Sequence, residues 1–263
     1  MNCYSKILKQ NLPKLWNLYN FDSFSDTYGL GDRNYWAWKT IDFANGTFQG
    51  GTHALAIASQ LGITADSNFT NKRIVDVILA SKSIIQKNGS VGEAYPQENS
   101  FCVTSLLAFD LLSAIKVLNE NNVITQEVKS ELLSVVCPLI NFISKNDEEH
   151  AIISNHIATG VAAITLWNKL SGEKNDRNET LLNFIFDHQS NEGWYKEYEG
   201  ADPGYQTLCT YYLASTYRVT NDSRLKESLV NSGKFLFDLL HPDYSIGGLY
   251  GSRNTEVYYP GGI

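Results

Sequence analysis

The segments TSLLAFDLLSAIKVL (residues 104–118) and HIATGVAAITLWNKL (156–170) decide the fold. Both are apolar or small almost all the way round, so a helix of either sequence must be buried on most of its faces. The segments 74–85, 128–143 and 224–240 instead place their apolar residues on one face, as an amphipathic helix does. The two kinds of segment alternate along the chain. This alternation predicts an all-α fold in which inner helices are nested behind outer ones.

Loops rich in glycine separate the predicted hairpins. They follow the outer helices at intervals that fit units of about fifty residues, which is typical of stacked helical hairpins. The loops are FANGTFQGGTH (43–53), QKNGSVGEAYPQENS (86–100), HQSNEGWYKEYEGADPGYQT (188–207) and HPDYSIGGLYGSRNT (241–255). The polar segment 144–156 takes this place in the remaining unit. Pro138 is expected to kink the helix over 126–145 or to divide it in two.

Charge and composition exclude several classes of protein. The formal net charge of −7 argues against binding to nucleic-acid phosphates. No segment approaches about 18 consecutive apolar residues, and the N-terminus lacks the apolar core of a signal peptide. The four cysteines are scattered, and the histidines lack metal-binding spacing. We therefore expect a soluble cytoplasmic protein, without a membrane span, whose single domain covers residues 1–263.

Three short motifs carry a family resemblance: SNH (154–156), GYQT (204–207) and YGSRNT (250–255). With the helical hairpins over roughly residues 36–260, they resemble the α/α-toroid carbohydrate-active enzymes, and most of all the heparinase-like polysaccharide lyases. The resemblance implies an α/α toroid that acts on an acidic or neutral oligosaccharide. No cofactor is expected, and no P-loop or GxGxxG motif is present.

The chain also departs from this family. It has an N-terminal helix and about four hairpins, fewer than a complete ring of this class, and no segment that could form the β-sandwich such lyases carry. The sequence therefore predicts an incomplete toroid or a piece of a longer protein, and an oligomer could complete the helical ring.

The resemblance implies a β-elimination mechanism for these residues. In the lyases an Asn neutralises the substrate carboxylate, a His or Tyr removes the adjacent proton, and a Tyr protonates the departing oxygen. Asn155, His156 and Tyr205 stand at the matching motifs. His supplies a base whose pKa lies near neutral pH. Arg253 is a cation that could bind the carboxylate bidentately.

Two other interpretations remain open. Glu197 and Asp202 are the pair of carboxylates that a glycoside hydrolase would need. The third possibility is a non-catalytic helical module that binds glycan or protein through its aromatic loops. The further candidates for contact with substrate, from three of these loops and their flanks, are Trp36, His53, Glu93, Trp194 and Tyr198.

Overall fold

The computed structural model describes residues 2–243, 245–246 and 259, and the regular secondary structure of these residues is entirely helical. The all-α prediction is therefore confirmed. In the described part of the chain, extended pairing is limited to isolated bridges. The helices of the first half are α1 (Cys3–Trp16), α2 (Arg33–Trp36), the 3-10 helix η1 (Gly46–Gly50), α3 (Gly51–Gln60), α4 (Ser67–Ala80), the 3-10 helix η2 (Ser81–Ser83), α5 (Phe101–Glu120) and α6 (Gln126–Lys145). Those of the second half are α7 (Ser154–Ser171), α8 (Arg177–Asp187), α9 (Pro203–Thr220) and α10 (Ser223–Asp238).

Contacts divide the chain into two compact units. Unit 1 comprises Met1–Lys145, and unit 2 comprises Asn146–Ile263. In the described residues each unit contains two antiparallel helical hairpins, α3–α4 and α5–α6 in unit 1, α7–α8 and α9–α10 in unit 2. The predicted number of hairpins is therefore confirmed, whereas the single domain over 1–263 stays a prediction.

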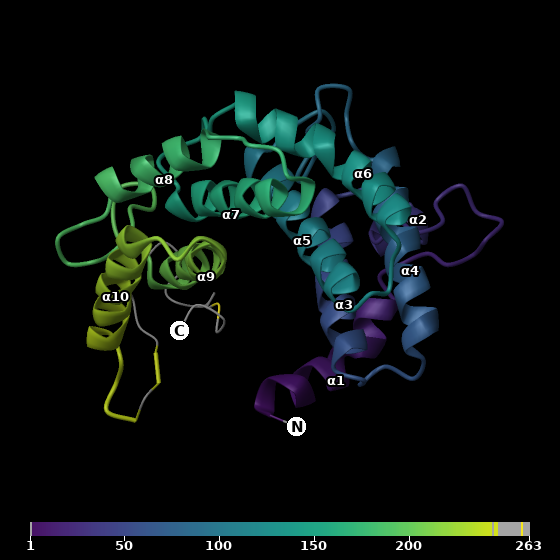
Figure 1. The fold of residues 1–263 in the computed structure, drawn as a ribbon, viewed down its shortest axis with the longest axis horizontal. Helices are drawn as coiled ribbons and strands as arrows, with labels where there is room; N and C mark the ends of the chain where they lie inside the picture. The colour runs from purple at the N-terminus through teal and green to yellow at the C-terminus, as the bar shows by residue number, and fades with distance from the viewer. Residues whose placement is uncertain (1, 244, 247–258, 260–263) are drawn as a thin grey trace. The chain divides into compact units, whose positions relative to one another are not determined.

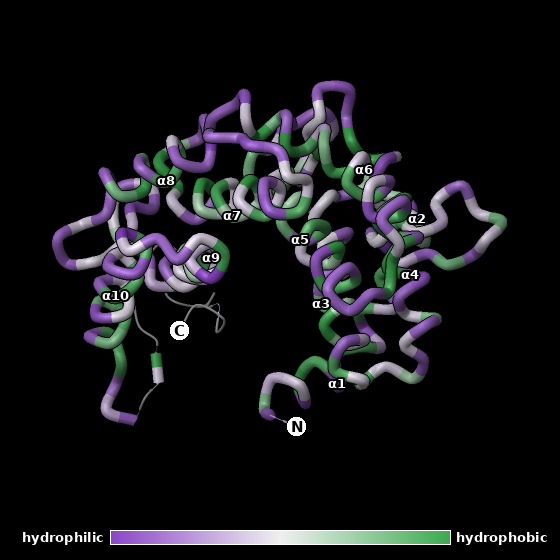
Figure 2. Tube along the Cα trace, in the orientation of Figure 1, coloured by the Kyte–Doolittle hydropathy of each residue, from purple (hydrophilic) through white to green (hydrophobic). Residues whose placement is uncertain are grey.

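In unit 1 the buried helices α3 and α5 pack against each other (Figure 1). The amphipathic helix α4 packs on α3, and α6 packs on α5. Leu107, Leu111 and Ile115 of α5 are completely buried, as the all-round apolar pattern predicts. Figure 2 shows apolar residues along α5 and hydrophilic residues in many of the connecting segments. The layers of this unit therefore follow from the two kinds of helix.

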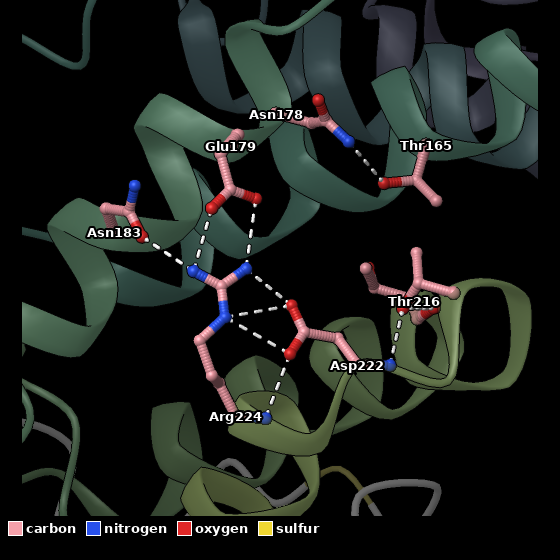
Figure 3. Close-up of polar contacts among 8 residues, drawn as sticks. Thr165, Asn178, Glu179, Asn183, Thr216, Asp222 and Arg224 are labelled. Atoms are coloured by element: carbon pink, nitrogen blue, oxygen red, sulfur yellow. Dashed lines mark hydrogen bonds and ion pairs between the residues drawn. The ribbon is translucent and has the colours of Figure 1, made fainter.

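Unit 2 repeats this arrangement with α7 and α9 as the buried pair. Helix α8 packs on α7, and α10 packs on α9. A surface network ties α10 to α8 (Figure 3): the Arg224 guanidinium binds both oxygens of Glu179, at 2.7 and 3.1 Å, and also the Asn183 side-chain oxygen. Asp222, at the start of α10, accepts from Nε of the same arginine. Three partner side chains on one guanidinium fix the start of α10 against α8.

α5 is the one described helix that is long and apolar enough to cross a membrane. Within unit 1, however, 78% of its most apolar window is buried. The apolar surface of α5 is thus covered by its own neighbours, which is the situation of a core helix.

Some boundaries differ from those predicted. Pro138 does not divide its helix, since α6 is continuous from Gln126 to Lys145 and buries Leu132, Val136 and Leu139 on either side of it. Packing of this apolar face outweighs the hydrogen bond that proline removes.

The first loop and the helix after it also differ. The loop predicted at 43–53 contains η1 and the start of α3. The helix predicted at 74–85 begins at Ser67, because the Asp66 side chain accepts the Phe69 N–H at 3.0 Å and caps it. It ends at Ala80, where η2 takes over.

A glycine in three of the loops makes a close approach to an outer helix. Gly29, Gly89 and Gly193 all have positive φ angles, of 83°, 92° and 98°. A Cβ on Gly89 would lie 2.2 Å from the carbonyl oxygen of Pro138, and one on Gly193 would lie 2.2 Å from that of Asn231. Glycine is required at both places by the backbone angle and by the lack of space.

Two buried glutamines fasten these loops. In unit 2, Oε1 of Gln206 accepts the Tyr195 N–H at 2.8 Å, and Nε2 donates to the carbonyl of Gly193 and to Ser232 of α10. In unit 1, Gln49 bonds in the same way to Gly31 and Gly29, and also to Val77 of α4 and Ser81 of η2. Each glutamine is at most 1% exposed. One side chain thus joins a glycine loop to the outer helix beside it.

Alanine substitutions separate the two reasons why residue 193 must be glycine, which are its positive φ angle and the lack of space for a side chain. Gly172 also has a positive φ, of 80°, but an added Cβ there would meet nothing within 4 Å. We expect Gly172→Ala to cost about 1 kcal/mol for the left-handed backbone alone. Gly193→Ala should cost about 1 to 3 kcal/mol more, because its methyl group must displace the backbone of α10. Urea unfolding of both variants measures the difference, and equal losses would contradict the close approach.

Candidate functional site

In unit 2 the loop before α9 is fastened to the segment before α7. Ser154 donates both its N–H and its hydroxyl to the carbonyl of Lys196, at 3.1 and 2.7 Å. Tyr198 N–H donates to the carbonyl of Ile152 at 2.8 Å. Unit 1 has a related bond, from Gly46 N–H to the carbonyl of Gly92. These bonds bring the start of α7 and the residues around Glu197 together.

Asn155 and Glu197 form a buried pair at this junction. The Asn155 backbone N–H donates to Oε1 of Glu197 at 2.9 Å, and its side-chain amide donates to Oε2 at 2.8 Å. Asn155 is 2% exposed and Glu197 is 3% exposed. Burial raises the pKa of the Glu197 carboxyl from 4.5 to about 8; the bonds from Asn155 oppose this rise, and the charge of Asp202 adds to it. Glu197 therefore carries a proton at neutral pH.

Asp202 is the N-cap of α9. Its Oδ1 accepts the backbone N–H of Tyr205 at 3.1 Å, and Pro203 occupies the first position of the helix. Asp202 is 4% exposed. The carboxylate therefore has a local structural role, and it is also the charge that acts on Glu197.

A second cluster of ionisable groups joins the first turn of α7 to the segment before it. Nδ1 of His156 is 2.7 Å from Oε2 of Glu148, and Nδ1 of His150 is 2.7 Å from Oε1. The Glu148 side chain is only 2% exposed, whereas that of His156 is 21% exposed. Burial alone would raise the pKa of Glu148, but the hydrogen bonds from the two histidines outweigh it and lower the pKa to about 2.

This geometry prepares His156 for proton transfer. Because Glu148 is ionised, Nδ1–H of His156 donates to it, which in a neutral imidazole leaves the lone pair on Nε2. A carboxylate behind the ring fixes both the tautomer and the ring orientation, as it does in many catalytic pairs.

The remaining candidates in unit 2 are more exposed. Tyr205, on the first turn of α9, is half-buried, and Tyr198 is 44% exposed with a φ of 57°. Trp194 is half-buried, and its Nε1 donates to Glu192 at 3.0 Å. Arg253 lies outside the described residues. The structure therefore pairs Asn155 with Glu197 and Asp202 with Tyr205, and His156 follows Asn155 in the chain. Their roles stay predictions.

Three predicted residues belong to unit 1. Nε1 of Trp36 donates to the carbonyl of Leu18 at 2.8 Å. Nδ1 of His53 lies 3.6 Å from Oδ1 of Asp110 on α5, and burial raises the pKa of that carboxyl while His53 opposes the rise. Glu93 is exposed.

Reasoning from the sequence missed Glu148 and Asp110. Glu148 lies in the acidic run DEEH. Because the whole segment 144–156 is polar, this run looked like part of an ordinary solvated loop. Asp110 had a clearer signal, because it is the one acidic residue in the apolar segment 104–118. A carboxylate on a helix that is buried all round needs a partner.

Comparisons with known proteins add no assignment. No model of a protein family matches the chain, and neither a curated protein nor a solved structure matches it. The described residues contain no cluster of three or more His, Cys, Asp and Glu side chains that could hold a metal ion.

The pKa of Glu197 predicts a dependence of stability on pH. Between pH 4.5 and about 8 the folded carboxyl keeps a proton that the unfolded chain has released. The contribution of Glu197 to stability is therefore fully present below pH 4.5 and is lost as the pH rises through about 8, by an amount on the order of a few kcal/mol. In Glu197→Gln, where the Asn155 amide can rotate to accept, this dependence should disappear.

Urea unfolding measured across this pH range checks the prediction. The matched control is Glu199→Gln, which changes an exposed carboxylate of the same loop and should keep the slope of the wild type. The same slope in Glu197→Gln and in the wild type would show that Glu197 titrates normally.

Proposed function

We propose that this chain is a carbohydrate-active enzyme that cleaves an acidic oligosaccharide by β-elimination. One observation carries the proposal: Nδ1 of His156 is held 2.7 Å from the buried carboxylate of Glu148. β-Elimination begins with removal of a proton from the carbon beside the substrate carboxylate, and this step needs a base that is correctly oriented and neutral.

The proposed reaction uses residues at the starts of α7 and α9 in unit 2. Nε2 of His156 takes the proton, a carbon–carbon double bond forms, and the bond to the leaving oxygen breaks. Tyr205 gives its phenolic proton to that oxygen, and water exchange then restores both residues. Glu148 is a positioning residue, which holds the imidazole and stabilises the imidazolium that forms.

The role proposed for Asn155 is modified by its contacts. Its side-chain amide already donates to Glu197, and it is buried. We therefore assign to Asn155 the positioning of Glu197, and assign the neutralisation of the substrate carboxylate to Arg253, which remains a proposal from the sequence.

The proposed architecture is an incomplete α/α toroid. It is supported by the alternation of buried and amphipathic helices within each unit. It is also supported by the glycine loops that precede the inner helices α5 and α9. The comparisons with known proteins supply no support for it.

A glycoside hydrolase is the second candidate, and a specific observation favours it. Glu197 has a pKa of about 8 beside Asp202, so the pair combines a protonated acid with a neighbouring carboxylate. Inverting and retaining hydrolases both need one protonated carboxyl group and one ionised carboxylate. The burial of Glu197 and Asp202, at 3% and 4% exposure, favours His156 over this pair as the group that meets substrate.

Variants of the histidine pair test the lyase proposal. We expect His156→Ala to lower kcat by about a hundredfold to ten-thousandfold, as for loss of a general base. Glu148→Gln keeps the size of the side chain but removes its charge, and it should lower kcat by about ten- to a hundredfold and move the pH profile with KM nearly unchanged. His188→Ala, at a half-buried histidine that caps the C-terminus of α8, is the matched control and should leave kcat unchanged.

The assay follows the ultraviolet absorbance of the unsaturated product and, separately, the appearance of reducing ends. Absorbance together with reducing ends supports elimination. Reducing ends without absorbance, lost in Glu197→Gln, would assign hydrolysis instead. Binding without turnover in the wild type would contradict both enzyme proposals.

A further inference from the structure

Unit 1 has an open cleft of about 630 Å³ on the loop side of its inner helices. The cleft lies where the segment after α2 meets the loop before α5. Its side chains combine aromatic rings with hydrogen-bonding groups: Lys39, Thr40, Asp42, Phe43, Tyr95 and Pro96. A second cavity of about 440 Å³ adjoins it and shares Asp42, Phe43 and Pro96. This size falls within the range of small-molecule sites.

Two aromatic rings belong to the cleft. Tyr95 is 55% exposed, although a ring of this size is costly to leave in water. Phe43 is half-buried, and its ring lies 3.1 Å from the place where a Cβ on Gly92 would stand. Phe43 is therefore held by packing, while Tyr95 offers an accessible face.

Strained backbone accompanies these rings. Lys39 has a φ of 50° and Gln97 has a φ of 61°. Neither residue has the short polar side chain that usually tolerates the left-handed region. Lys39 lines the first cavity and Gln97 lines the second. Strain of this kind concentrates where a structure positions groups for a ligand.

In both units a backbone hydrogen bond joins two loop segments, which we call the loop frame, but different side chains stand beside it. The bond from Gly46 N–H to the carbonyl of Gly92 corresponds to that from Ser154 N–H to the carbonyl of Lys196. The next residue is Glu93 in unit 1, which is exposed, and Glu197 in unit 2, which is buried and bonded to Asn155. The unit 1 frame therefore lacks a buried acid at this position and has open aromatic surface beside it.

We propose that the cleft of unit 1 is a binding site for neutral oligosaccharide, separate from the ionisable groups of unit 2. A pyranose ring has an apolar face that stacks on Tyr95 and hydroxyl groups that bond to Asp42, Thr40 and Lys39. One cation and one carboxylate line the larger cavity, and the smaller adds the carboxylate of Asp26, so the charge disfavours a polyanion. The class of ligand rests on the proposed function.

The test measures binding by the full chain that carries His156→Ala, so that turnover does not consume the probe. Cellohexaose, mannohexaose and xylohexaose are titrated by calorimetry, with galacturonic acid oligomers of the same length as the acidic probe. We expect at least one neutral probe to bind more tightly than the acidic one. Tyr95→Ala should weaken that binding by about tenfold, and Tyr95→Phe, which keeps the ring, should weaken it far less.

Tyr4→Ala is the matched control, since Tyr4 is a 65% exposed tyrosine on α1 of the same unit, and it should leave binding unchanged. Failure of all three neutral probes to bind, or binding that Tyr95→Ala does not weaken, overturns the inference. Binding of peptides from a casein digest in place of the sugars, lost in Tyr95→Ala, would assign the cleft to a protein partner and also overturn it. Sugar binding that depends on Tyr95, in a wild type without turnover, would uphold the inference while the lyase proposal fails.

Discussion

The close approach between a loop glycine and an outer helix is the constraint on which both units depend. Gly89 and Gly193 place their backbone where a methyl group would overlap a helix carbonyl. In unit 2 a buried glutamine, Gln206, adds hydrogen bonds to the loop and to α10 at the same point. Because a buried amide without partners would be costly, its several bonds also select one arrangement of the loop.

The loop frame determines which ionisable groups can be buried beside it. Once Ser154 and Tyr198 have paired the segment before α7 with the loop before α9, Glu197 lies against Asn155 in a site that excludes water. Glu148, a few residues before α7, meets its two histidines instead. The same end of unit 2 thus holds one carboxyl whose pKa is raised and one whose pKa is lowered. Hydrogen-bond partners, rather than depth alone, separate the two.

The helices could be predicted because the spacing of apolar residues in the sequence shows which helix faces are buried. The all-round apolar segments 104–118 and 156–170 are buried in α5 and α7, and the four hairpins follow from their alternation with amphipathic segments. Boundaries were harder, since the cap formed by Asp66 is a single side chain and the continuity of α6 through Pro138 depends on tertiary packing.

The site was predictable only in part. The short motifs and the loop 188–207 suggested Asn155, His156 and Glu197 as candidates, but the residues that contact them could not be predicted from the sequence. Glu197 and Asn155 are 42 residues apart, and no local pattern encodes that contact. Glu148 is eight residues from His156, within a run of charge that also suits an ordinary surface loop.

The shared bond from Gly46 to Gly92 and from Ser154 to Lys196 has a consequence for how such a chain can change. Main-chain groups make this fastening, and they are present whatever the side chains are. Side-chain substitutions that spare the close-packed glycines and the buried glutamines therefore leave this fastening in place. Because the chain has this loop frame in both units, one unit can keep its function while the other acquires a new specificity.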